Sequence, residues 1–415
     1  MKQNVWILNH YAGNMLFDKG GRHYNFAKFL KQAGYHPVVF CANSKHFSRG
    51  SFFPLDTLYR VEMAEELEIP FLFVKAREYV GNGKQRIFNM WEFFQNVQKT
   101  ALDYAKNHEK PDVIYASSVH PLTLWAGIRL AKHFGVECVC EVRDLWPESL
   151  VAYGMLPRSN PATKLLYLGE KWLYKTCDRL IMTWPGGWDY IEERGWDKAI
   201  PREKVIHIDN GVDLAAFLEN AKTPLEDPDL DSSCFKAIYT GSIRKVNNLQ
   251  LLVDAAEILH SRGNEAVKIL VYGDGDQRED LARQAEHLPN ILFKGRVAKS
   301  AVPAVLSRGQ VSILHNSRSV LDKYGQSQNK FFEYLAAGKP VLMTYSVGHS
   351  VCKARACGLE LEDQTPEAVA DALEMLARLP AEEYAAYCRN ASEAAVDYDF
   401  ACLTKKLIAV LEGTK

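Results

Sequence analysis

Short apolar runs alternate with amphipathic helical stretches, twice over, along this chain. In the first half the runs are "NVWIL" (4–8), "HPVVFCA" (36–42), "DVIYAS" (112–117) and "ECVCEV" (137–142). In the second half they are "FKAIYTG" (235–241), "VKILVYG" (267–273), "NILFKGRV" (290–297) and "VSILHN" (311–316). Such alternation is typical of βαβ units and predicts an α/β chain with two doubly wound parallel sheets. Ligands bind such folds at the carboxyl ends of the strands, so we expect two sets of loops facing one another across a cleft.

Composition and charge narrow the class of protein. The net charge of -1 gives no reason to expect nucleic acid as a partner. The nine cysteines include no C-x-x-C pair, which favours reduced thiols in a cytosolic protein over disulfides or zinc. No run of about eighteen apolar residues exists, and the start "MKQNVWILNHYAG" resembles a first strand rather than a signal peptide. We therefore expect a cytoplasmic protein.

The loop "YTGSIRKVNNLQLL" (239–252) has the residue types of an anion site. Gly241 permits a tight turn, Arg244 and Lys245 supply two cations, and a helix from about Asn248 offers free N–H groups. The alternative is an ordinary basic surface loop after a strand.

Two further glycine loops follow the next strands. In "VYGDGDQREDL" (271–281), Gly273 and Gly275 permit close backbone approach, and the aspartates at 274 and 276 resemble either helix caps or a metal-binding pair; capping is favoured. In "FKGRVAKS" (293–300), Gly295 lets the backbone around Val297 contact a flat ligand.

The segment "NKFFEYLAAGKPVL" (329–342) predicts a short helix that ends at a left-handed Gly338, followed by a buried strand. Glu333 lies among aromatic and aliphatic neighbours. It is either solvated on a narrow polar face or held for a ligand, because buried carboxylates are rare unless paired.

These four segments, in this order at successive strand ends, resemble the retaining glycosyltransferases of family 4, which have the GT-B fold. The resemblance extends over nearly the whole chain and is greatest to the bacterial surface-polysaccharide branch that includes proposed L-fucosaminyltransferases. It implies an acceptor-side Rossmann-like domain at 1–213, a nucleotide-sugar-binding Rossmann-like domain at 214–395, and a C-terminal helix (about 396–415) packed back onto the first domain.

The resemblance also implies roles for residues of the second domain. Glu333 would bind the ribose hydroxyls of the donor, and the loop at Gly295 and Val297 would hold the base. Arg244 and Lys245 would neutralise the pyrophosphate. The family's second glutamate, eight residues before the ribose ligand, is replaced by Gly325. Asn329 and Lys330 are then the candidates for contacts to the donor sugar.

In the first half, "FDKGGRHYNFAKFL" (17–30) places Gly20 and Gly21 before a helix, where the family has a glycine-rich loop near the donor phosphate and the acceptor. The alternative is a flexible surface loop. "CEVRDLWPESL" (140–150) carries Arg143 and Asp144 at the end of an apolar strand. We expect Asp144 to orient the acceptor hydroxyl and Arg143 to balance charge. His120, at a strand–helix junction, fits chemistry or simple packing.

The stretch "RIFNMWEFFQNVQKTALDYA" (86–105) has apolar residues on one helical face, which is usually core. The basic residues Lys75, Arg77, Lys84 and Arg86, at or just before its start, leave peripheral contact with an anionic inner-membrane surface as an alternative.

The predicted activity is that of a retaining, metal-independent, hexosyltransferase-type enzyme. It would move a sugar from a nucleotide diphosphate donor, with uridine favoured by family habit, to a hydroxyl of a glycan or lipid-linked acceptor. The nucleotide-sugar is a substrate, so no cofactor is expected. The alternatives are a sugar-nucleotide 2-epimerase of GT-B architecture and a non-catalytic nucleotide-sugar sensor.

Overall fold

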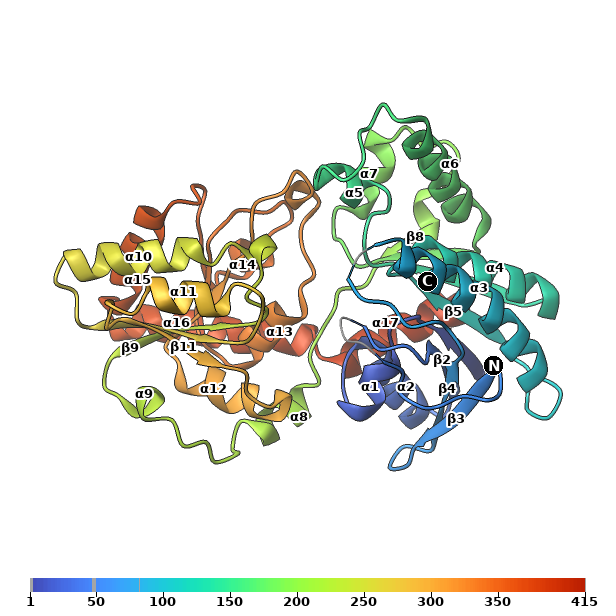
Figure 1. Cartoon of the computed structure of the whole chain (residues 1–415), viewed down its shortest axis with the longest axis horizontal. Helices are drawn as coiled ribbons and strands as arrows, with labels where there is room; N and C mark the ends of the chain where they lie inside the picture. The colour runs from blue at the N-terminus through green and yellow to red at the C-terminus, as the bar shows by residue number, and fades with distance from the viewer. Residues whose placement is uncertain (1–2, 47–49, 82, 415) are drawn as a thin grey trace. The chain divides into compact units, whose positions relative to one another are not determined.

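The computed structural model describes residues 3–46, 50–81 and 83–414 and divides the chain into two compact units (Figure 1). One unit comprises Met1–Asp209 and Leu403–Lys415, and the other comprises Asn210–Cys402. The domain boundary expected from the sequence lies nearby, at 213. In the first unit the last helix, α17 (Phe400–Glu412), is held at its end by two contacts. The hydroxyl of Tyr35 donates to Glu412 over 2.7 Å, and Arg179 donates to the carbonyl of Val410 over 2.9 Å.

The first unit is built on an eight-stranded sheet with the order β3-β4-β2-β1-β5-β6-β7-β8. Every neighbouring pair is parallel except β3 and β4. The strands are β1 (Asn4–Leu8), β2 (His36–Ala42), β3 (Tyr59–Ala64), β4 (Ile69–Val74), β5 (Val113–Ser117), β6 (Glu137–Val142), β7 (Arg179–Met182) and β8 (Val205–His207). Its other helices are α1 (Gly13–Phe17), α2 (Arg22–Gln32), α3 (Lys84–Tyr104), α4 (Pro121–Phe134), α5 (Glu148–Ala152), α6 (Pro161–Thr176) and α7 (Gly187–Glu193).

The second unit contains a six-stranded parallel sheet with the order β11-β10-β9-β12-β13-β14. The strands are β9 (Phe235–Thr240), β10 (Val267–Tyr272), β11 (Ile291–Gly295), β12 (Val311–Leu314), β13 (Val341–Met343) and β14 (Gly358–Glu360). The helices are α8 (Leu214–Asn220), α9 (Pro228–Asp231), α10 (Gln250–Ser261), α11 (Arg278–Gln284), α12 (Val302–Arg308), α13 (Asn329–Ala336), α14 (Val351–Arg355), α15 (Pro366–Ala377) and α16 (Ala381–Asp397). Apolar clusters with α10 and α15, and with α12, α13 and α16, form its core.

The predicted fold class is therefore confirmed: two parallel α/β sheets lie in series along the chain. Strand order reverses between β1 and β5 in the first sheet and between β9 and β12 in the second. Ligands of open α/β sheets bind at such switch points, outside the carboxyl ends of the strands. Among the described helices, none has the length and apolar character needed to cross a membrane.

Residues 218–234 contain two prolines and five acidic residues, a composition typical of a surface linker, but part of this segment is folded onto the second unit. The segment contains α9, and Leu230 is buried against the second core. Lys294 pairs with Asp227 over 2.9 Å and also contacts Asp229, while the hydroxyl of Tyr272 donates to Asp227 over 2.8 Å. Asp227 and Asp229 thus have partners on β10 and β11, which a charge count along the sequence does not reveal.

A buried ion pair holds the start of α2 against β6 in the first unit. Arg22 and Glu141 are fully buried, and Arg22 donates two hydrogen bonds to Glu141, over 2.8 and 2.6 Å. Arg22 also donates to the carbonyls of Ile208 and Asp209, and the hydroxyls of Tyr115 and Ser117 donate to Glu141. Burial acts to raise the pKa of Glu141, but Arg22 and His23 outweigh it and hold that pKa well below its usual value.

We predict that Glu141→Gln lowers the free energy of unfolding of the first unit by about 3–5 kcal/mol, because it leaves the buried Arg22 charge without its counter-charge. Denaturant unfolding followed by tryptophan fluorescence measures this, since all eight tryptophans precede residue 209. The matched control is Glu137→Gln on the same strand, whose half-exposed pair with Arg179 is worth about 1 kcal/mol or less. Equal losses in the two variants would contradict the prediction.

Candidate functional site

A cavity of about 500 Å³ lies at the carboxyl ends of β9, β10 and β11 in the second unit. Three loops form it, and they are the loops that the sequence singled out after these strands. Gly241, Gly273, Gly275, Arg244 and Val297 are among its lining residues, and the others are Thr240, Ser242, Tyr272, Asp274, Arg296, Lys299 and Val302. The sequence thus predicted where this cavity lies and most of the segments that form it.

The glycines of this cavity bring its loops together. Gly273 has a φ of +152°, and a Cβ at this position would lie 1.8 Å from the carbonyl oxygen of Gly241. A Cβ at Gly275 would lie 2.1 Å from the carbonyl oxygen of Ile243. The amide of Gly273 donates to the carbonyl of Gly295 over 2.8 Å. In this structure, Gly273 and Gly275 therefore allow the loop after β10 to approach the backbone of the loop after β9.

Three cationic side chains line the cavity: Arg244, Arg296 and Lys299. Lys245, expected to join Arg244, is exposed in the 3-10 turn Lys245–Asn247 and is not a lining residue. Lys299 was not among the predicted residues, although the basic residues of "GRVAKS" directly after β11 were a signal that could have identified it. The arrangement can stabilise a group with several negative charges.

The interpretation of Asp274 and Asp276 as helix caps is wrong. The N-cap of α11 is Gln277, and no side chain caps this helix. Asp274 instead accepts from the amide of Gly275 over 2.9 Å and pairs with Arg278 over 3.4 Å, so it orders its own loop. Within residues 3–46, 50–81 and 83–414, no group of three or more His, Cys, Asp and Glu side chains is placed to hold a metal ion.

Helix α13 begins and ends as the sequence predicted, with Gly338 at a φ of +62° just beyond it. The hydroxyl of Tyr334 accepts from the amide of Thr240 over 3.1 Å, which ties α13 to the cavity. Glu333 is partly buried and is not one of the residues that line the cavity. Burial raises the pKa of Glu333, and the positive charge of Lys299, which does line the cavity, acts to lower it. Glu333 therefore lies within electrostatic reach of the cavity wall.

Asn329 and Lys330, the candidates for sugar contacts, lie outside the cavity lining. Asn329 is exposed. Lys330 donates to the carbonyl of His315 over 3.2 Å, and its ammonium group lies 4.7 Å from the ring centroid of Tyr239. Burial lowers the pKa of Lys330 to about 8. Gly325 has a φ of +86°, so a glutamate at this position would be strained, which gives a physical reason for the departure from the family pattern.

In the first unit, the predicted glycine loop directly precedes α2. Gly21 is the N-cap of this helix, with a φ of +100°, and the buried Arg22 is its first residue. The ion pair with Glu141 therefore fixes the position of Gly20 and Gly21. The loop joins α1 to α2, and α1 follows β1, which borders the switch point between β1 and β5.

Arg143 and Asp144 follow β6, as predicted. Asp144 is exposed when the whole residue is considered. Desolvation of its carboxyl group nevertheless raises the pKa of Asp144, while the charges of Arg143 and Arg86 act to lower it. The backbone of Arg143 is held at both ends. Its amide donates to the hydroxyl of Ser118 over 3.2 Å, and its carbonyl accepts from the indole of Trp184 over 2.7 Å.

The structure gives His120 a packing position. It is 1 % exposed, and its Nε2 lies 2.9 Å from Nδ1 of His10, which is equally buried. Burial, together with the nearby charge of Arg86, lowers the pKa of His120 to about 3. A neutral histidine enclosed in this way favours the packing role over chemistry.

Arg86, near the start of α3, is a candidate that the sequence analysis placed elsewhere. It belongs to the basic residues that were considered for a membrane surface. Its Nε donates to the hydroxyl of Tyr11 over 3.2 Å, and its charge acts on both Asp144 and His120. Arg86 therefore belongs to the surroundings of Asp144, a relation between residues far apart in the sequence.

Glu170 of α6 is a buried carboxyl group that the sequence analysis did not identify. It accepts hydrogen bonds from the hydroxyls of Tyr174 and Tyr190, over 2.7 and 2.8 Å. Burial raises its pKa from 4.5 to about 8. It lines a small cavity together with Asp144 and His120, so an uncharged acid lies close to the candidate acceptor side.

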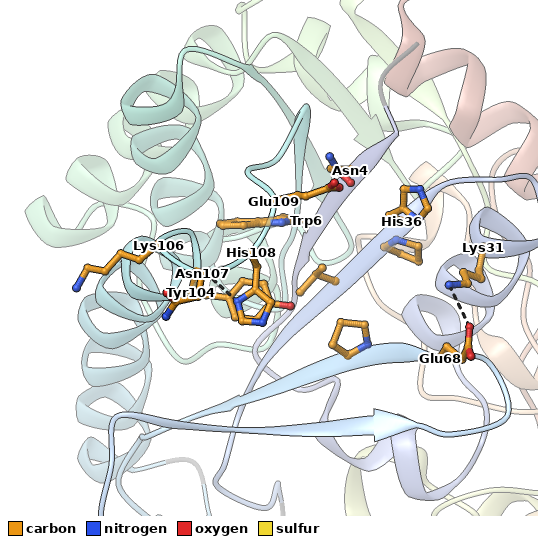
Figure 2. A pocket seen from close by; sticks show the side chains of 13 residues that line it. Asn4, Trp6, Lys31, His36, Glu68, Tyr104, Lys106, Asn107, His108 and Glu109 are labelled. Carbon is orange, nitrogen blue, oxygen red and sulfur yellow. Dashed lines mark hydrogen bonds and ion pairs between the residues drawn. The ribbon is translucent and has the colours of Figure 1, made fainter.

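A second hollow, of about 620 Å³, opens at the amino ends of β1, β2 and β4 (Figure 2). Figure 2 shows the ion pair of Lys31 with Glu68 on one side, and His108 stacked on Tyr104 on the other. This edge of the sheet is opposite to the one where ligands of such folds bind. The hollow is therefore a poorer candidate for the ligand-binding site than the cavities at the carboxyl ends of the strands.

Comparison with known proteins bears on both units. Residues 22–216 match the family model described as Glycosyltransferase Family 4, and residues 234–378 match the model described as Glycosyl transferases group 1. The chain carries both domains of a glycosyltransferase. No curated protein sequence is similar enough to this glycosyltransferase to count as a relative.

Solved structures of similar fold cover the chain almost completely. Sucrose-phosphate synthase from Thermosynechococcus elongatus has a TM-score of 0.72 at 16% identity and covers 99% of both chains. An E. coli structure titled as trehalose-6-phosphate bound with UDP-2-fluoro glucose has a TM-score of 0.72 at 11% identity and covers 100% of both. Anabaena HepE, in complex with UDP and glucose, has a TM-score of 0.65 at 15% identity and covers 99% of this chain and 100% of its own. These likenesses confirm the predicted GT-B fold.

We predict that Gly273→Ala lowers the free energy of unfolding of the second unit by about 3 kcal/mol or more. The reason is that backbone strain at a positive φ adds to a clash of the new Cβ with the backbone of Gly241. The control is Gly263→Ala, which has a φ of +69° but open space at its Cβ, so only the strain of about 1–2 kcal/mol remains. Thermal unfolding followed by circular dichroism compares the two. Similar losses would show that the contact between Gly273 and Gly241 is not a constraint.

We also predict a pH dependence from Glu170. Between pH 4.5 and about 8 the folded protein holds a proton that the unfolded chain has lost, so the stability of the fold falls as pH rises through this range. Glu170→Gln removes that slope. As pH rises through this range, the free energy of unfolding of the variant therefore increases relative to that of wild type, by up to about 1.4 kcal/mol per pH unit. The measurement is denaturant unfolding at pH 5 and pH 8. The exposed Glu192→Gln is expected to keep the wild-type slope, and a Glu170→Gln protein that also kept it would contradict the prediction.

Proposed function

We propose that this glycosyltransferase is a retaining, metal-independent enzyme of the hexosyltransferase type. It transfers a sugar from a UDP-sugar to a hydroxyl group of a glycan or lipid-linked acceptor, in the synthesis of surface polysaccharide. The observation that carries the proposal is the cavity of the second unit, where Arg244, Arg296 and Lys299 meet at the carboxyl ends of three parallel strands.

The charges of this cavity fit a diphosphate leaving group. Negative charge develops on the leaving diphosphate as the bond to the sugar breaks, and fixed cations stabilise it without reorganisation. HepE, a protein of similar fold, has been solved with UDP and with UDP-glucose, which supports a uridine nucleotide here. We assign the ribose hydroxyls to Glu333, whose helix is tied to the cavity through Tyr334 and Thr240.

The cavity also favours a front-face transfer. Of its described lining residues only Asp274 has a carboxylate, whereas a route through a glycosyl-enzyme intermediate uses a pair of carboxyl groups. In the front-face reaction the leaving phosphate oxygen takes the proton of the acceptor hydroxyl. We assign Asp144 to orient that hydroxyl, with Arg143 and Arg86 balancing its charge.

The test is a thermal-shift panel of UDP-, GDP- and ADP-sugars, followed by turnover. A UDP-sugar present at a hundred times its Kd is expected to stabilise the protein by about 2.7 kcal/mol. Arg244→Met is expected to weaken binding by about 10- to 100-fold, because a hydrogen bond to a charged group is lost. Arg262→Met, on the exposed end of α10, is the control and should bind as wild type does.

Asp144→Asn separates binding from transfer. It should bind the UDP-sugar normally, and its release of UDP with decyl β-glucoside as acceptor should fall by about 100-fold or more. A wild-type protein stabilised by no UDP-sugar would overturn the proposal. UDP release without acceptor, with a rearranged free sugar, would indicate a 2-epimerase, and binding without turnover would indicate a sensor.

A further inference from the structure

An apolar groove lies between α4 and α6 in the first unit and has a volume of about 380 Å³. Three indoles and several leucines form most of its wall: Trp125, Trp146, Trp172, Leu165, Leu166 and the open backbone at Gly169. Its volume is in the range of small-molecule sites, about 300–1,000 Å³. Glu170 is the one ionisable residue of the described lining, and its carboxyl group is uncharged at neutral pH because burial raises its pKa to about 8. A sugar or nucleotide would find few hydrogen-bond partners here, whereas a hydrocarbon chain fits the chemistry of the wall.

The apolar wall continues onto the surface. Leu165 is 69 % exposed, Leu168 64 % and Trp172 44 %. Their spacing of three and four residues places them on one face of α6. An aromatic row leads from Trp172 through Trp125 and Phe94 to Trp91 on α3, with ring centroids 6.4, 4.8 and 5.3 Å apart. Phe94 of this row is buried, whereas Trp91 at its end is 44 % exposed. Apolar side chains exposed together, as Leu165, Leu168 and Trp172 are, mark a binding site rather than the scattered exposure of an ordinary surface.

The charges beside the groove are positive. Lys164, Lys171 and Lys175 are spaced along α6, and Arg129 is exposed on α4. Glu170 is the only acidic residue of α6, and it is buried. Helices that bind anionic lipids typically have leucine and tryptophan on one face and lysine beside them. The charges therefore complement a phosphate group attached to the hydrocarbon.

The groove also meets the small cavity beside Asp144. Pro121, Trp146, Glu170 and Leu173 line both hollows, and Asp144 lies only two residues before Trp146. A molecule seated in the groove would therefore have its polar end close to the carboxyl group that we assign to the acceptor hydroxyl.

We propose that the groove between α4 and α6 binds the hydrocarbon chain of a lipid-linked acceptor, with the acceptor's phosphate beside the lysines of α6. The acceptor hydroxyl then extends toward Asp144. This proposal rests on the proposed function, because it names the substrate class of the same acceptor side. It places the lipid on α6 and α4, and so accounts for apolar surface that packing leaves uncovered.

The test uses decyl phosphate, at concentrations below micelle formation, and follows tryptophan fluorescence, since three of the eight tryptophans line the groove. Wild type should show saturable binding, and inorganic phosphate should neither bind nor compete at the same concentrations. Gly169→Leu should weaken binding by about tenfold or more, because the new side chain displaces two or more methylene groups from the groove. A Cβ at Gly169 meets no atom within 4 Å, so this change is expected to leave the fold intact.

Two further variants keep the test decisive. Ala162→Leu adds the same side chain to the exposed first turn of α6, outside the groove, and should bind decyl phosphate as wild type does. Leu165→Glu places a negative charge at the exposed mouth of the groove and should weaken binding even if Gly169→Leu were to misfold. Equal binding by wild type and both groove variants would overturn the proposal. So would a stable dimer that Leu165→Glu dissociates, because a second copy would then cover this face.

The same proteins are tested for stabilisation by UDP-sugars. Loss of decyl phosphate binding with UDP-sugar binding intact is the result expected for Gly169→Leu. A wild-type protein that binds UDP-sugars but not decyl phosphate would overturn the groove alone. A wild-type protein that binds decyl phosphate but no UDP-sugar would instead overturn the proposed function.

Discussion

The contact between the loops after β9 and β10 is the constraint on which the candidate nucleotide site depends. At Gly273 the backbone passes so close to Gly241 that a single Cβ would overlap a carbonyl oxygen. The loop after β10 is also hydrogen bonded to the end of β11, from the amide of Gly273 to the carbonyl of Gly295. The side chains of Arg244, Arg296 and Lys299 then converge on one cavity. Without this approach Arg244, on the loop after β9, would be solvated apart from Arg296 and Lys299, which share the loop after β11.

The first unit uses a different means to fix its loops. A buried arginine and glutamate, with tyrosine, serine and backbone carbonyl partners, join the start of α2 to β6 and to residues 208 and 209. A buried ion pair costs desolvation energy and is weak evidence for stability by itself. Its effect here is positional, because Arg22 is the residue after the Gly20-Gly21 loop and Glu141 lies three residues before Asp144. One interaction thus holds both predicted loops of this unit.

Much of this arrangement follows from patterns in the sequence, and the failures have identifiable physical causes. The buried central strands have continuous apolar runs, so the two sheets and their loop order could be predicted. β3 could not, because the half-exposed residues of this edge strand give no such run. Lys299 lines the cavity and Lys245 does not, and this difference depends on the direction of the two 3-10 turns that contain them. The packing of His120 and the place of Arg86 depend on partners more than thirty residues away, which one sequence does not reveal.

The two edges of the first sheet have a consequence for how the protein can associate. β3, at one edge, exposes Arg60 beside Glu62, and β8, at the other, is only three residues long. Charged and very short edge strands are poor templates for the main-chain pairing that adds a foreign strand. Growth of this sheet from molecule to molecule, and the fibrous aggregates that result from it, are therefore disfavoured at both ends.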